Sequence, residues 1–79
     1  MKNYREYEVA PEVYDAIEQA SEKFAVLKSS KGSYTLGREM EFTDSETYAV
    51  DSARAAAASG VEALAVNTTT EEVLLDTNE

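Results

Sequence analysis

The sequence predicts a single small α+β domain over residues 1–79, with two helices packed on one face of a three- to four-stranded sheet. The expected element order is β-α-β-α-β-β. Three patterns predict it: an apolar stripe at helical spacing within residues 11–27, alternating apolar and polar residues over residues 33–42, and two short apolar runs around a turn near residue 70. A chain of this length allows only a small core, and a homodimer would bury more surface.

The N-terminal part is expected to hold one strand and one amphipathic helix. Residues 2–9 resemble a strand, and Pro11 fits the first turn of a helix, where its missing N–H costs nothing. Helical spacing over residues 11–27 places five apolar residues on one face: Val13, Ile17, Ala20, Phe24 and Leu27. Four acidic residues fall on the opposite face: Glu12, Asp15, Glu18 and Glu22.

A half-buried strand is expected over residues 33–42, after a turn at residues 28–32. Arg38 falls on the apolar face of this strand, so we expect a bulge or a bend at Gly37 that turns Arg38 toward solvent. The remaining apolar face comprises Tyr34, Leu36, Met40 and Phe42, and the polar face comprises Ser33, Thr35, Glu39 and Glu41.

A second helix is expected over about residues 44–59. Its start matches a capping box, in which Thr43 caps the helix and Glu46 reaches back to the cap. Gly60 is expected to end the helix. Its inner face is mostly Ala, with Tyr48 and Ala49 in the first turns.

A hairpin is expected to close the chain. Residues 61–66 and 72–76 form its strands, and residues 67–70 form the turn.

Missing residue types exclude several kinds of chemistry. The chain has no Cys, which excludes disulfides, zinc fingers and thiol nucleophiles, and no His, which excludes a Ser-His-Asp triad. The isolated glycines form no phosphate loop, and the acidic clusters lack the spacing of a calcium loop. We therefore expect no enzyme and no catalytic, cofactor-binding or metal site.

The charge balance is strongly acidic, with 16 Asp and Glu against 7 Lys and Arg and a net charge of −9. Such a charge repels phosphate, so we expect no direct binding to nucleic acid or to an anionic membrane. The start of the chain, residues 1–5, lacks the apolar core of a signal peptide. We expect a cytoplasmic protein, in the host cytoplasm if it is phage-encoded.

The order of the charges suggests a partner. Six acids and no base occur from Glu6 to Glu22, four bases and no acid from Lys23 to Arg38, and five acids and no base from Glu39 to Asp51. If these blocks met on one face, their field would steer the chain onto a basic protein. The expected contact residues combine the acidic helix face with two tyrosines: Glu12, Asp15, Glu18, Glu22, Tyr14 and Tyr7.

In size, acidity, absence of Cys and tyrosine content, the chain is similar to small phage-encoded anti-defence proteins, including some anti-CRISPR proteins. This similarity implies a non-enzymatic inhibitor whose carboxylates mimic the phosphates of nucleic acid in the basic groove of a nucleic-acid-handling complex. Two alternatives stay open. One is a small accessory subunit or antitoxin-like partner of a basic protein, which binds through tyrosines and an exposed sheet edge. The other is a halophile-type acidic domain without mimicry.

Overall fold

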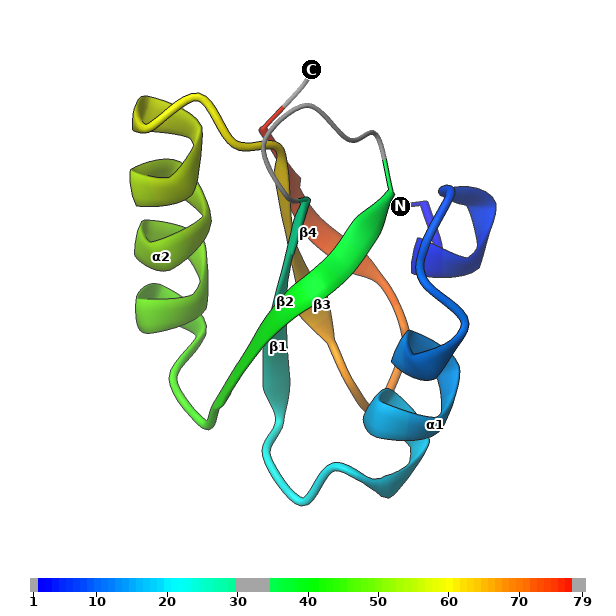
Figure 1. The fold of residues 1–79 in the computed structure, drawn as a ribbon. Coiled ribbons are helices and arrows are strands. Elements are labelled where there is room, and N and C mark those ends of the chain that lie inside the picture. The colour runs from blue at the N-terminus through cyan, green and yellow to red at the C-terminus, as the bar shows by residue number, and fades with distance from the viewer. Residues whose placement is uncertain (1, 30–34, 78–79) are drawn as a thin grey trace.

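The computed structural model describes residues 2–29 and 35–77, and it confirms the α+β class (Figure 1). Its element order is α-β-β-α-β-β after a short 3₁₀ helix. The bounds of the elements are η1 Tyr4–Glu6, α1 Glu12–Gln19, β1 Phe24–Ser29, β2 Leu36–Thr43, α2 Glu46–Ala58, β3 Ala63–Asn67 and β4 Val73–Asp76.

The strands form one four-stranded sheet in the order β2-β1-β3-β4, and each neighbouring pair is antiparallel. Because β1 runs antiparallel to both of its neighbours, β2 and β3 are parallel to each other and lie one strand apart. The connection between them contains α2, which gives a split β-α-β arrangement. β2 and β4 are the two edge strands.

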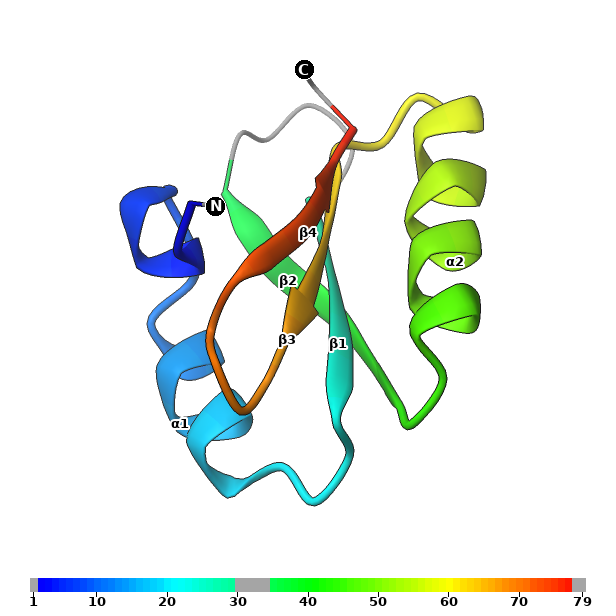
Figure 2. The ribbon, with the colours of Figure 1, turned by 180° about the vertical axis from the view of Figure 1, so that it is seen from behind.

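The two helices lie on opposite faces of this sheet, so the prediction that they share one face is wrong (Figures 1 and 2). The central strands β1 and β3 are apolar on both sides, and each side therefore needs a cover. On one side, Val13 and Ile17 of α1 pack with large side chains that include Leu27 and Leu64. On the other side, α2 packs against Val26 and the alanines of β3.

The cluster under α2 is built from small side chains. Ala49 and Ala53 of α2 are fully buried and pack with Ala63 and Ala65 of β3. This confirms the expected Ala-rich inner face, which lets a helix lie close to the sheet. Tyr48 was expected on the same face, but it is 53% exposed.

The predicted strand at residues 2–9 is not formed. Tyr4–Glu6 is a 3₁₀ helix whose start is capped by Asn3, with a capping box to Glu6. Single bridges tie the segment to the sheet at both ends, from Asn3 to Glu72 and from Val9 to Leu36. Tyr4 is fully buried in the cluster under α1, so this segment is held by side-chain packing rather than by a ladder.

The predicted helix at residues 11–27 is correct only in its first half. α1 ends at Gln19, and Ala20 has extended backbone angles of φ −66° and ψ 135°. Phe24 and Leu27, expected on the helix stripe, belong to the central strand β1. The apolar run from Ala25 to Leu27 is buried on both sides of the sheet, and such a run matches a buried helix equally well in sequence.

The predicted bulge at Gly37 is confirmed. Lys28 pairs with Glu39 but Ser29 pairs with Leu36, so β2 carries extra residues there, and Arg38 is exposed. Gly37 has a φ of +93° and is buried. As expected, Leu36 joins the core under α1, with Met40 and Phe42 packed against it. Residues 30–34 of the predicted turn and strand lie outside the described residues.

Both ends of α2 follow from local chemistry. Gly60 follows the helix with a φ of +84°, which confirms its predicted role. The cap at the start is Ser45 rather than Thr43: the hydroxyl oxygen of Ser45 accepts a hydrogen bond from the backbone N–H of Tyr48 at 3.1 Å. Thr43 instead accepts from the backbone N–H of Ser45, also at 3.1 Å.

Candidate partner-binding surface

Three of the predicted acidic residues form one exposed surface on α1. Val13 and Ile17 face the sheet and are buried, whereas Glu12, Asp15 and Glu18 are exposed. None of these three carboxylates forms an ion pair with another described residue. The outer side of α1 therefore carries negative charge that no ion pair among the described residues compensates. We call these three residues the α1 carboxylates.

Glu22 does not continue the α1 carboxylates along the helix. It lies in the connection from α1 to β1, where its backbone carbonyl accepts a hydrogen bond from the Thr68 hydroxyl at 2.6 Å. Its carboxylate accepts from the Ser21 hydroxyl at 3.1 Å. The α1 carboxylates therefore span about 9 Å by helix rise, instead of the about 15 Å of an unbroken helix through Glu22.

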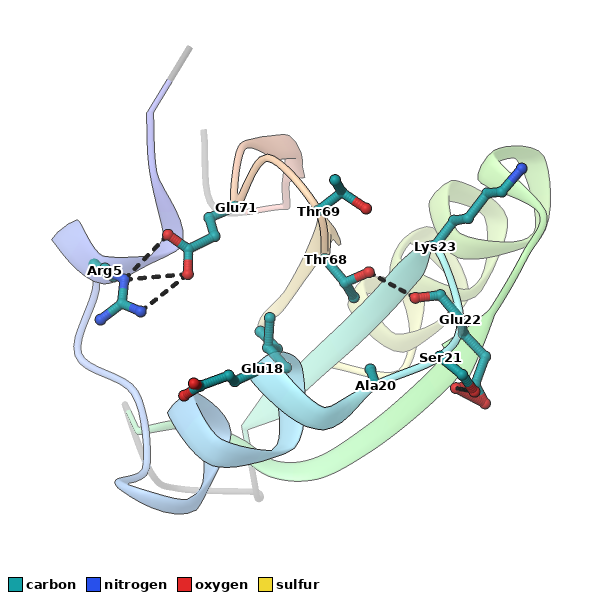
Figure 3. A pocket seen from close by; sticks show the side chains of 10 residues that line it. Arg5, Glu18, Ala20, Ser21, Glu22, Lys23, Thr68, Thr69 and Glu71 are labelled. Atoms are coloured by element: carbon teal, nitrogen blue, oxygen red, sulfur yellow. Dashed lines mark hydrogen bonds and ion pairs between the residues drawn. The ribbon is translucent and has the colours of Figure 1, made fainter.

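Glu18 and Glu22 both line a pocket of about 540 Å³ between the end of α1 and the β3–β4 turn, and their side chains lie at different ends of it (Figure 3). Arg5, Lys23 and Glu71 also line it. Three acids and two bases give this pocket a mixed charge, unlike the outer side of α1. The remaining lining residues are Ile17, Ala20, Ser21, Thr68 and Thr69.

A two-pronged ion pair closes one side of this pocket. The Arg5 Nη2 atom lies 2.9 Å from the Glu71 Oε2 atom, and Arg5 Nε donates to both carboxylate oxygens at 3.2 and 3.3 Å. The hydrogen bond from Arg5 lowers the pKa of Glu71. Glu71 adopts a positive φ of 65°. No local sequence pattern predicts this pair, because its members are 66 residues apart.

The tyrosines of this region contact neighbours within the chain. Tyr14 is half-buried, and its ring lies 5.7 Å from the fully buried ring of Tyr4. The Arg5 guanidinium lies 5.1 Å from the Tyr14 ring centroid, and the Lys2 ammonium lies 5.7 Å from that of half-buried Tyr7. Tyr14 and Tyr7 thus each keep a part-exposed surface beside a cation, whereas Tyr4 belongs to the core.

The acidic blocks do not gather on one face. The α1 carboxylates lie on the side of the sheet that α1 covers, whereas Glu46 and Asp51 lie on α2, on the opposite side (Figure 1). A partner that contacts α1 therefore meets mainly the first acidic block.

Among the described residues, no group of Asp and Glu side chains is arranged to hold a metal ion. No helix within residues 2–29 and 35–77 is long and apolar enough to cross a membrane. Comparison of the chain with protein-family models, with curated proteins and with solved structures finds no match.

Proposed function

We propose that this chain is a non-enzymatic binding protein of the cytoplasm, which inhibits a basic, nucleic-acid-handling partner by occupying its nucleic-acid groove. The observation that supports it best is the surface of α1 carboxylates, Glu12, Asp15 and Glu18, which are exposed and have no ion pair within the described residues. Carboxylates held on one rigid element can take the places of phosphates beside Lys and Arg.

The whole-chain charge supports the same proposal. A net charge of −9 accelerates encounter with a basic surface and repels nucleic acid itself. Glu18 also lines the pocket of mixed charge, so the purely acidic contact is the outer side of α1. The short reach of the α1 carboxylates fits the mimicry of a few phosphates rather than of a long duplex.

Competition with nucleic acid tests this proposal. A labelled duplex is bound to each member of a panel of basic nucleic-acid-binding proteins, and the chain is added at several salt concentrations. We expect release of the duplex from at least one member, with an apparent affinity that falls steeply as salt rises. The combined variant Glu12→Gln, Asp15→Asn and Glu18→Gln should reduce the slope of log affinity against log salt by up to about three.

A matched variant controls for charge alone. Glu46→Gln, Asp51→Asn and Glu72→Gln also remove three exposed carboxylates, but none of them is on α1. We expect this control to bind nearly as well as the unchanged chain. The proposal is overturned if the two variants lose affinity equally, if salt has no effect, or if no member of the panel releases its duplex.

A further inference from the structure

Among the described residues, no strand lies along most of the outer edge of β2. At its start, the Leu36 N–H donates to the Glu8 carbonyl at 3.1 Å, and the Ala10 N–H donates to the Leu36 carbonyl at 2.8 Å. From Arg38 to Thr43, the described residues make no backbone hydrogen bonds to β2 beyond its ladder with β1. An open edge of this kind can pair with an added strand.

The ladder shows which backbone groups point outward. Successive residues of a strand direct their N–H and C=O groups to alternate sides. Ser29 donates to the Glu62 carbonyl at 2.9 Å and Lys23 accepts from the Thr68 N–H at 2.9 Å, so odd-numbered residues of β1 face β3. Even-numbered residues of β1 therefore face β2, where their partners are Glu39, Glu41 and Thr43. The outward groups of β2 belong to Met40 and Phe42.

The side chains on one face of this edge are acidic. Glu39 and Glu41 both lie on the face that α2 covers, since Glu41 pairs with Val26 of the cluster under α2. Because their backbone groups point inward, they form the close, non-hydrogen-bonded positions for an added antiparallel strand. Glu39 is exposed, and Glu41 lies 3.4 Å from the Lys28 ammonium. Glu39 is therefore the less compensated charge.

An exposed aromatic side chain continues the same face. The Ser52 hydroxyl donates to the Glu41 carboxylate at 2.5 Å, which places this side of α2 beside β2. Tyr48 precedes Ser52 by four residues, so it lies one turn away on the same side of the helix. The Tyr48 ring is 53% exposed. A cation on an added strand would approach Glu39 and Glu41 on the same side of the sheet as Tyr48.

The other face of the edge is apolar. Met40 and Phe42 are half-buried against the core under α1. Apolar side chains on an added strand would lie next to them and cover the surface that they leave exposed.

A second copy of this chain does not suit the same edge. If Met40 paired with its own copy in an antiparallel arrangement, Glu39 would lie opposite Glu41. If Met40 paired with Phe42, Glu41 would lie opposite itself. Like charges directly opposite each other destabilise a strand pair. In these two registers the acids oppose self-pairing, and their charge favours a basic strand.

We propose that the outer edge of β2 binds an extended segment of another protein in which Lys or Arg alternates with apolar residues. The basic side chains lie toward Glu39, Glu41 and Tyr48, and the apolar ones lie toward Met40 and Phe42. This surface is separate from the α1 carboxylates, so its test does not depend on the function proposed above.

Three labelled peptides of about ten residues test the proposal. One alternates Lys with Val, one has the same composition with all Lys before all Val, and one alternates Glu with Val. Anisotropy titrations should show the first peptide binding at least about ten-fold more tightly than either control. Equal binding of the two Lys peptides would show charge attraction without strand pairing, and would overturn the proposal.

Substitutions at Met40 separate backbone pairing from side-chain packing. Met40→Pro removes an outward N–H and leaves the ladder with β1 intact, whereas Met40→Ala removes most of the side chain and keeps the N–H. We expect Met40→Pro to weaken the alternating Lys peptide about ten-fold or more, and Met40→Ala less than about three-fold. Glu39→Lys should weaken that peptide and strengthen the alternating Glu peptide. Equal effects of Pro and Ala would contradict the proposal.

Hydrogen exchange locates the bound peptide in the unsubstituted chain, which keeps the test decisive if Met40→Pro fails to fold. The amides of Met40 and Phe42 should become protected when the alternating Lys peptide binds, whereas that of Glu41, already in the ladder, should change little. Protection elsewhere without protection at Met40 and Phe42 would overturn the proposal. A dimer of the free chain that Met40→Pro abolishes would overturn the assignment of the edge to a basic segment.

Discussion

Gly37 controls how closely α1 approaches the sheet. A Cβ atom at this position would collide with the Cγ2 atom of Val13, and the φ of +93° is unfavourable for any residue with a side chain. We predict that Gly37→Ala lowers the free energy of unfolding by about 3 kcal/mol, through backbone strain and overpacking together. Urea denaturation of the variant and of the unchanged chain measures this difference.

Gly60 supplies the control for this prediction. Its φ is +84°, but a Cβ atom there would meet no other atom within 4 Å. Gly60→Ala should therefore cost only about 1 kcal/mol, from backbone strain alone. Equal losses at the two glycines would show that close contact with Val13 contributes nothing to the requirement for Gly37.

At the level of the elements, the ion pair between Arg5 and Glu71 joins η1 to the β3–β4 turn. The hydrogen bond from Arg5 lowers the pKa of Glu71 below its ordinary value of 4.5. A carboxylate of lowered pKa adds stability above its ordinary pKa, and this stability is lost as pH falls through the lowered value. We predict that Glu71→Gln unfolds at a lower temperature than the unchanged chain at pH 7, and that the gap closes below about pH 4.

Thermal unfolding across this pH range checks the prediction, with Glu72→Gln as the neighbouring control. Glu41 also makes stability depend on pH, because the hydrogen bond from Ser52 and the nearby charge of Lys28 lower its pKa as well. Glu71→Gln should therefore keep part of the acid sensitivity. A gap between Glu71→Gln and the unchanged chain that stays constant down to pH 3 would rule out the ion pair as its cause.

Sequence patterns predicted some elements well because those elements have one polar and one apolar side. The alternation in β2 and the start of α1 are such cases, and Gly37 and Gly60 marked a bulge and a helix end through their backbone freedom. β1 lacks such a signal, because its residues Ala25, Val26 and Leu27 are all buried. Phe24 and Leu27 also extend the helical spacing of α1, and no Gly or Pro marks the end of that helix at Ala20.

The residues of the candidate site were likewise predictable only where a local sequence pattern determines their position. Exposure of Glu12, Asp15 and Glu18 follows from the periodicity of α1 and was predicted. The position of Glu22 was not predicted correctly, because it depends on where α1 ends. The pairing of Arg5 with Glu71 depends on the tertiary fold, which brings η1 beside the β3–β4 turn, and no local pattern carries that information.

At the scale of the whole molecule, the sheet separates two cores of different character. Large side chains such as Leu27 and Leu64 fill the side under α1, and alanines fill most of the side under α2. Covering both faces lets a chain of 79 residues bury most of its two central strands. It also distributes the acidic blocks over both sides, so the two surfaces that we propose for basic partners lie apart.

The net charge of the chain affects its stability. Carboxylates outnumber basic side chains by 16 − 7 = 9, so like-charge repulsion opposes the compact state. Salt screens this repulsion, and we predict that the midpoint of thermal unfolding rises between about 0.02 and 0.3 M NaCl. The combined variant Glu12→Gln, Asp15→Asn and Glu18→Gln has a net charge of −9 + 3 = −6 and should show a smaller rise. A midpoint that falls with salt would mean that favourable ion pairs outweigh the repulsion.

Screening is nearly complete by about 1 M salt, where the Debye length is about 3 Å. A steep further rise of the unfolding midpoint in molar NaCl would therefore favour adaptation to a high-salt cytoplasm.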